Sequence, residues 1–267
     1  MKDRVNEKLK PEAIIFDFGF TLLYFVNPSM EKWNSLEEQG LNLVGKFLLN
    51  KGVFTKDIQI QRFIKKVRRL NLKFLKRSFE TKLEYTSSYI FKEALNEMKY
   101  LDGAIINDFL TLEVLEEMSD MYYSIGEKEW IPFEDTLETL NKISEANIKT
   151  AVLSNTKHHN IILKQLRDYN LLNYFEIVVT SAEFGKRKPN IEIFQHTLDK
   201  LGVSNCPENC VMIGDEAADM IGGKKAKLTT ILINREFKFP FEQEIKKKYQ
   251  PDYKIDKISE LFKYIQI

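Results

Sequence analysis

The fold that we expect for this chain is decided by the stretch AIIFDFGFTL at residues 13–22. Its first four residues are apolar, as in a short buried strand, and Asp17 stands where that strand ends. Later segments also end in polar groups, namely Ser154, Lys188 directly before a proline, and the pair Asp215 and Asp219. Because a parallel α/β sheet gathers ligands at the carboxyl ends of its strands, we expect these groups to form one site for a metal-bound anion.

Beyond residue 132, short apolar runs alternate with segments of helical periodicity. The expected strands lie at 150–153, 177–179, 211–214 and 229–233, and a short strand with a final helix is expected within 252–264. Such alternation predicts a parallel sheet covered by helices on both faces. The fold class is therefore α/β, with a doubly wound, Rossmann-like core.

The segment between the first strand and this alternation has helical periodicity throughout. Helices are expected at about 30–49, 55–77, 81–98 and 107–124, and no proline occurs between Pro28 and Pro132. We therefore predict a core domain of residues 1–26 and 129–267, interrupted by an all-helical cap domain of residues 27–128. A cap inserted at this point can close over a ligand and exclude water.

Composition excludes several classes of protein. The chain has 267 residues with 40 Lys and Arg against 39 Asp and Glu, which gives no argument for a nucleic-acid or membrane partner. The first ten residues are too charged for a secretory signal, so we expect a cytoplasmic protein. For its assembly we expect a monomer or homodimer. Cys206 and Cys210 are interpreted as buried structural thiols rather than as a metal site or a disulfide.

Four motifs occur in order at predicted strand or loop ends: FDFGFTL at 16–22, VLSN at 152–155, KRKPNIEIF at 186–194 and VMIGDEAAD at 211–219. With the insert after the first strand, they resemble the haloacid dehalogenase-like (HAD) hydrolases that carry a helical cap. The resemblance covers nearly the whole chain past its first dozen residues. It implies a hydrolase, and above all a Mg²⁺-dependent phosphatase of a small phosphorylated metabolite.

The resemblance also implies roles for single residues. Asp17 would be the nucleophile that forms an aspartyl-phosphate. Ser154 and the backbone N–H of Asn155 would bind phosphoryl oxygens, although both residue types also favour helix N-caps. Lys188 would neutralise charge on the nucleophile and on the phosphoryl group.

The metal site that the resemblance implies consists of oxygen ligands, which Mg²⁺ prefers. Asp17 and Asp215 would contribute carboxylates and Gly19 its backbone carbonyl. Asp219 would complete the site by orienting Lys188 or a metal-bound water, or it would cap the following helix.

Gly19 departs from the family pattern, because phosphatases of the family carry a second aspartate there as general acid and base. Glycine transfers no proton, so a contribution of about 10²–10⁴ in rate is missing unless another group supplies it. The alternatives are a weak phosphatase, a 2-haloacid dehalogenase, a hydrolase of phosphonoacetaldehyde type, or a catalytically silent binding module. Dehalogenases usually lack the acidic pair that binds metal, whereas Asp215 and Asp219 are present here.

The expected cap gives one further hypothesis. Its second helix carries many basic residues, and Arg68 and Arg69 are candidates for contacting an anionic substrate. The alternative is that this run is a solvated helix face.

Overall fold

The computed structural model describes residues 8–98, 109–237, 240 and 244–267. The chain divides into two compact units. The α/β unit comprises residues 1–25, 131–155 and 166–267, and the helical unit comprises residues 26–130 and 156–165. The helical unit thus includes the segment 27–128 and also the ten residues that follow the VLSN motif.

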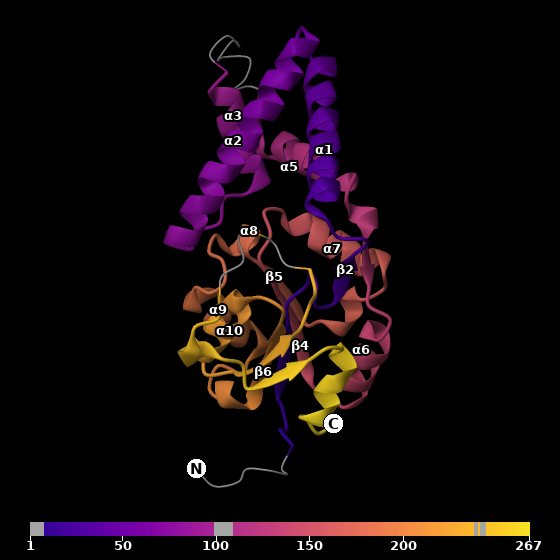
Figure 1. The fold of residues 1–267 in the computed structure, drawn as a ribbon, viewed down its shortest axis with the longest axis vertical. Coiled ribbons are helices and arrows are strands. Elements are labelled where there is room, and N and C mark those ends of the chain that lie inside the picture. The colour runs from indigo at the N-terminus through magenta and orange to yellow at the C-terminus, as the bar shows by residue number, and fades with distance from the viewer. Residues whose placement is uncertain (1–7, 99–108, 238–239, 241–243) are drawn as a thin grey trace. The chain divides into compact units, whose positions relative to one another are not determined.

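The α/β unit is built on a six-stranded parallel sheet of order β5-β4-β1-β6-β7-β8 (Figure 1). Its strands are β1 (Ala13–Phe16), β4 (Lys149–Ser154), β5 (Ile177–Thr180), β6 (Cys210–Gly214), β7 (Thr229–Ile233) and β8 (Tyr253–Ile255). The predicted α/β class is therefore confirmed. The central strand β1 is fully buried, and the chain order reverses around it, which is where such sheets bind ligands.

Helices cover both faces of this sheet. Helices α9 (Ile191–Leu201) and α10 (Ala217–Lys225) pack on one face, where Ile15, Leu153 and Phe194 share a core. Helix α6 (Thr136–Glu145) does not belong to this α9–α10 layer. It packs against the 3-10 helix η5 (Ile258–Lys263), and both elements bury apolar side chains. The shorter elements are α8 (Ser181–Phe184), η2 (Leu172–Tyr174), η3 (Pro207–Asn209) and η4 (Lys247–Tyr249).

The helical unit has its own hydrophobic core. It contains α1 (Met30–Asn50), α2 (Asp57–Thr81), α3 (Ser87–Asn96), α5 (Leu112–Ser124), η1 (Glu127–Glu129) and the first part of α7 (His159–Asp168). Hydroxyl side chains begin three of these helices, because the side chains of Ser29, Thr86 and Thr111 each accept a hydrogen bond from a backbone N–H in the first turn. Buried apolar residues of all four long helices form one cluster.

Several predictions about elements need correction. The second helix continues to Thr81 and ends at Lys82 in the left-handed region (φ 61°), so the third helix begins at Ser87. The expected final strand and helix are present as β8 and the 3-10 helix η5. A two-stranded sheet of β2 (Leu23–Phe25) and β3 (Trp130–Pro132) was not predicted, because three residues show no periodicity. The expected start of the fourth helix at 107 lies outside the described residues, and α5 begins at Leu112.

The two cysteines are free thiols. Cys210 is buried as predicted, but Cys206 is only half-buried, and its Sγ lies 3.2 Å from a carboxylate oxygen of Glu12. This correction follows from the position of Cys206 at the surface turn that precedes η3.

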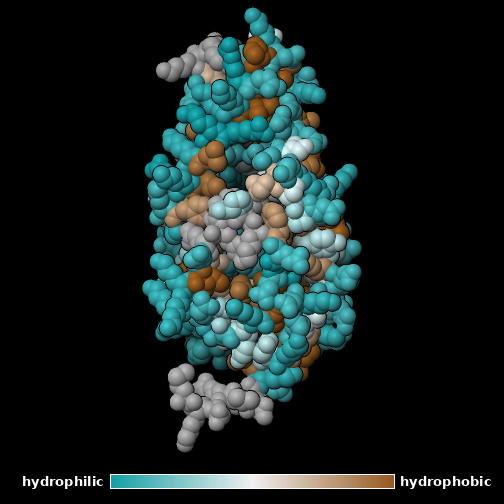
Figure 2. All heavy atoms as spheres, viewed as in Figure 1, coloured by the Kyte–Doolittle hydropathy of each residue, from teal (hydrophilic) through white to brown (hydrophobic). Residues whose placement is uncertain are grey.

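On the face shown in Figure 2, hydrophilic residues cover most of the surface and hydrophobic ones occur in small groups. Among the described residues, no helix has the length and apolar character that crossing a membrane requires.

Candidate active site

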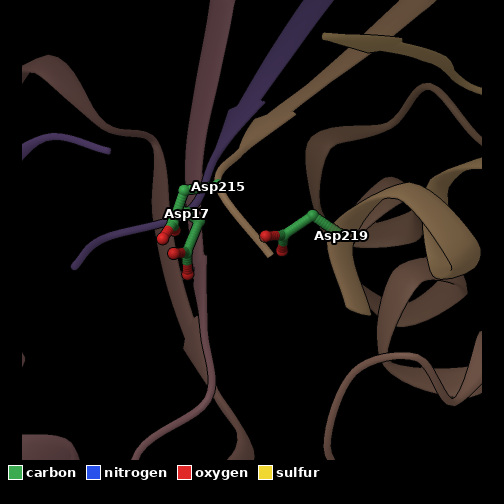
Figure 3. A group of neighbouring side chains, drawn as sticks. All are labelled: Asp17, Asp215 and Asp219. Atoms are coloured by element: carbon green, nitrogen blue, oxygen red, sulfur yellow. The ribbon is translucent and has the colours of Figure 1, made fainter. Parts of the chain in front are cut away.

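Three carboxylates of the α/β unit converge at the carboxyl ends of neighbouring strands (Figure 3). Asp17 follows β1, Asp215 follows β6, and these two strands pair in parallel register. Asp219 lies in the first turn of α10. One carboxylate oxygen of each residue lies within 4.8 Å of the others. The chain thus concentrates negative charge at the point where the sheet topology reverses.

The placement of Asp219 depends on Gly214 and on the start of α10. Its Oδ2 accepts a hydrogen bond from the Glu216 backbone N–H at 3.1 Å, which closes the first turn of the helix. A Cβ on Gly214 would lie 2.3 Å from the Asp219 carboxyl group, so any other residue there would displace it. Asp219 therefore caps the helix with one oxygen, while its other oxygen faces the carboxylate cluster.

Lys188 brings a buried ammonium group into this cluster. Its Nζ lies 2.6 Å from Oδ1 of Asp17 and 2.6 Å from Oδ1 of Asp219, and it donates a hydrogen bond of 2.8 Å to the Leu153 carbonyl. The residue is 3% exposed and precedes Pro189 through a cis peptide bond. Lys188 thus joins the nucleophile candidate to the carboxylate on α10.

The VLSN motif fixes the backbone of Lys188. Asn155 accepts a hydrogen bond from the Lys188 N–H at 2.8 Å and donates one to the Lys188 carbonyl at 3.2 Å. Ser154 is the last residue of β4 and is 5% exposed. Sequence reasoning assigned Asn155 to the substrate and missed this reciprocal contact, which no spacing within one motif reveals.

The electrostatics of the cluster follow from burial and from like charges. Burial, Asp17, Glu216 and Asp219 together hold the pKa of Asp215 well above its usual range. Burial raises the pKa of Asp219 to about 7, although Lys188 opposes this shift. Burial by itself would lower the pKa of Lys188, but Asp17 and Asp219 raise it above its ordinary value, so the ammonium stays charged.

The site has the donors that a divalent cation requires. Oδ1 of Asp215 is buried and has no hydrogen-bond partner among the described residues. A buried carboxylate oxygen is costly when nothing compensates it, and the ion pairs among the described residues bring one ammonium group, that of Lys188, to this cluster of three carboxylates. Carboxylate and carbonyl oxygens are the ligands that Mg²⁺ prefers, so these residues fit that ion.

The two arginines of the predicted substrate contact lie in the helical unit. Arg68 forms ion pairs with Glu37 at 3.7 Å and with Glu38 at 3.0 Å, and Arg69 pairs with Glu97. The Arg69 side chain is 60% exposed, so its ion pair adds little stability. The structure therefore gives both arginines acidic partners that the basic run in the sequence did not suggest.

A family model described as haloacid dehalogenase-like hydrolase matches residues 53–233. The chain belongs to this family. It is a hydrolase, as the motifs predicted, and curated phosphatases are among its relatives.

Two curated relatives illustrate the range of similarity. A pyrophosphatase PpaX of Halalkalibacterium halodurans is 25% identical over 196 residues, which cover 71% of this chain and 86% of the relative. A glyceraldehyde 3-phosphate phosphatase of Methanothermobacter thermautotrophicus is 34% identical over 134 residues, but these cover only 49% of this chain and 57% of the relative. The second match therefore extends over little more than half of that phosphatase.

Solved structures resemble the fold over nearly the whole chain. The HAD-hydrolase YfnB of Bacillus subtilis, which is described as bound to magnesium, aligns with a TM-score of 0.56 at 20% identity and covers 98% of this chain and 100% of its own. A 2-haloacid dehalogenase of Pseudomonas syringae aligns with a TM-score of 0.63 at 16% identity, covering 96% and 97%. Since proteins of different chemistry share this fold, the reaction has to be argued from the site.

Proposed function

We propose that this chain is a Mg²⁺-dependent phosphatase that acts on a small phosphorylated metabolite through an aspartyl-phosphate at Asp17. The observation that carries the proposal is the cluster of Asp17, Lys188, Asp215 and Asp219, in which a buried Asp215 oxygen has no hydrogen-bond partner within the part of the chain that the structure describes. The phosphatase names of curated relatives agree with it.

In this proposal Asp17 attacks the phosphorus atom and the ester oxygen of the substrate leaves. Lys188 bonds to Oδ1 of Asp17, which leaves the other carboxylate oxygen for the attack. The charged ammonium group offsets the negative charge that gathers on the phosphoryl oxygens. Ser154 and the Asn155 backbone N–H bind those oxygens, and water then hydrolyses the acyl phosphate to free Asp17.

Asp17, Asp215 and the Gly19 carbonyl would hold Mg²⁺, with Asp219 beside them bonded to Lys188. The ion would supply positive charge next to the transferred phosphoryl group. The same carboxylates count against carbon–halogen cleavage, because the halide that leaves needs no metal cation beside it. Halide release from 2-chloropropionate without metal would favour a dehalogenase. If the protein neither releases halide nor hydrolyses p-nitrophenyl phosphate but binds a partner tightly, a catalytically silent module would be favoured.

The metal site gives the first prediction. We expect Mg²⁺ at 100 times its Kd to raise the free energy of unfolding by about 2.7 kcal/mol, and Asp215→Asn to remove most of this gain. Urea denaturation with and without Mg²⁺ measures it, together with Mg²⁺-dependent hydrolysis of p-nitrophenyl phosphate. Asp199→Asn, an exposed aspartate on α9, is the matched control. Equal stabilisation of wild type and Asp215→Asn would contradict the site.

Magnesium binding should also depend on pH. The pKa of Asp219 is about 7 and that of Asp215 is raised too, so the metal-free cluster holds protons at pH 6 that the ion has to displace. We therefore expect the apparent Kd to be about tenfold higher at pH 6 than at pH 8. The stability of the metal-free protein should depend on pH as well. Because the pKa of Asp219 rises from 3.8 to about 7 on folding, the free energy of unfolding should fall as the pH rises between these two values.

The hypothesis that Arg68 and Arg69 contact the substrate gives the next prediction. If it holds, replacing both with alanine raises KM about tenfold or more for an anionic substrate and changes kcat little, because charged contacts are lost. Replacing both with lysine keeps the charge and should restore part of the loss. An unchanged KM would mean that the two arginines only pair with Glu37, Glu38 and Glu97.

We further propose that the protein works in the cytoplasm as a monomer or homodimer. The free thiols of Cys206 and Cys210 agree with a reducing compartment. Size-exclusion chromatography with light scattering tests the oligomeric state, and a larger assembly would contradict it.

A further inference from the structure

Arg235, which follows β7, contacts three distant segments of the α/β unit. Its Nε donates to the Phe20 carbonyl, and its Nη1 donates to the Asp256 carbonyl at 2.8 Å. Its guanidinium carbon lies 4.0 Å from the centre of the Phe133 ring. One side chain therefore holds the loop after β1, the segment before α6 and the segment after β8 together.

The residue that Arg235 bonds has an unusual backbone conformation. Phe20 has a φ of 54°, in the left-handed region that non-glycine residues rarely occupy. Its side chain is 8% exposed and stacks on Phe237, with ring centres 5.8 Å apart. Such strain persists only where the surroundings hold it, and here Arg235 and Phe237 of one segment supply both the hydrogen bond and the stacking contact.

Gly19 directly precedes Phe20, and the peptide bond between them carries the Gly19 carbonyl. A residue that fixes the conformation of Phe20 therefore also limits the orientation of that carbonyl. We propose that Arg235 is a positioning residue, which holds the loop of Gly19 and Phe20 so that the Gly19 carbonyl is oriented as a cation ligand. This inference rests on the proposed magnesium site.

A purely electrostatic role of Arg235 predicts the opposite sign. The positive charge of Arg235 lies near enough to Asp215 to interact with it electrostatically. A cation beside a metal ligand repels Mg²⁺, so removing the charge alone would tighten metal binding. Removing the bond to Phe20 should weaken it, so the direction of the change separates the two roles.

The experiment titrates Mg²⁺ into metal-free wild type, Arg235→Ala, Arg235→Lys and the control Arg167→Ala by calorimetry. Arg167 is an exposed arginine on α7. We expect Arg235→Ala to raise the Kd about 10- to 100-fold, as loss of an outer-shell partner of a metal site does, with no change in the control. Lysine keeps the charge but lacks the rigid guanidinium fork that reaches both the Phe20 and the Asp256 carbonyls, so the Kd of Arg235→Lys should also rise. If Arg235→Ala does not fold, the Kd of Arg235→Lys tests the positioning role.

Hydrogen exchange of the metal-free proteins gives a second readout. The Leu22 and Leu23 N–H groups donate to the Phe18 carbonyl, so they report on this loop. In Arg235→Ala their exchange should accelerate about tenfold or more relative to the β1 amides, which report on global stability.

The outcomes separate this inference from the proposed function. A Kd that falls or stays unchanged in both Arg235 variants overturns the positioning role and leaves the magnesium site intact. A wild type that binds no Mg²⁺ overturns the proposed function and the ligand role of Gly19. In that case unchanged exchange at Leu22 and Leu23 would also overturn the claim that Arg235 holds the loop.

Discussion

Replacing Asp17 with asparagine is expected to lower the Mg²⁺-dependent hydrolysis of p-nitrophenyl phosphate by at least ~10³-fold. Asparagine has nearly the same shape, so the end of β1 should keep its packing. Its amide is a poor nucleophile, and the ion pair of Asp17 with Lys188 is lost. Initial rates at saturating Mg²⁺ measure the effect, because Asp17 is also a proposed ligand of the ion.

The same assay on Asp199→Asn shows what a neutral change at the surface does. Asp199 is exposed on α9, and this variant should keep the wild-type rate. The circular dichroism of Asp17→Asn should match that of wild type, which separates lost chemistry from lost folding. A variant that retains a tenth of the rate or more would mean that another group attacks the phosphorus atom.

The predictable part of the site comes from local patterns. Asp17, Ser154 and Asp215 follow or end apolar strands, and a parallel sheet brings such strand ends together without knowledge of any side-chain contact. The strand order places β1 between β4 and β6, so the three residues had to lie at one edge of the sheet. The family resemblance then supplied the roles.

Other parts of the site depend on contacts between residues far apart in the chain. Asn155 bonds to the backbone of Lys188, 33 residues away, and Arg235 bonds to the carbonyl of Phe20, 215 residues away. A basic run such as that around Arg68 shows its charges but not the glutamates of other segments that pair with them. Backbone strain at Phe20 is also invisible in the sequence, because phenylalanine rarely takes a positive φ.

Replacing Gly19 with aspartate is expected to raise kcat for p-nitrophenyl phosphate by about 10- to 100-fold, which reaches only the lower limit of the ~10²–10⁴-fold contribution of a general acid and base. Backbone conformation does not oppose the change, because Gly19 is not among the glycines with positive φ in the described chain. The new carboxyl group would lie two residues after the nucleophile, where the family pattern places its proton carrier. We expect less than the full range because the neighbouring Phe20 is held at a φ of 54°, which limits how the loop can adjust to a second carboxylate.

Gly19→Asn is the matched control, since asparagine fills the same space and transfers no proton. If proton transfer is what the site lacks, only the aspartate variant gains rate, and its kcat acquires a dependence on pH that reports the new carboxyl group. Equal gains in both variants would point to loop rigidity instead, because glycine is the most flexible residue at that position. A flat rate in Gly19→Asp would mean that water or another side chain already carries the proton, and that Gly19 is no defect of this enzyme.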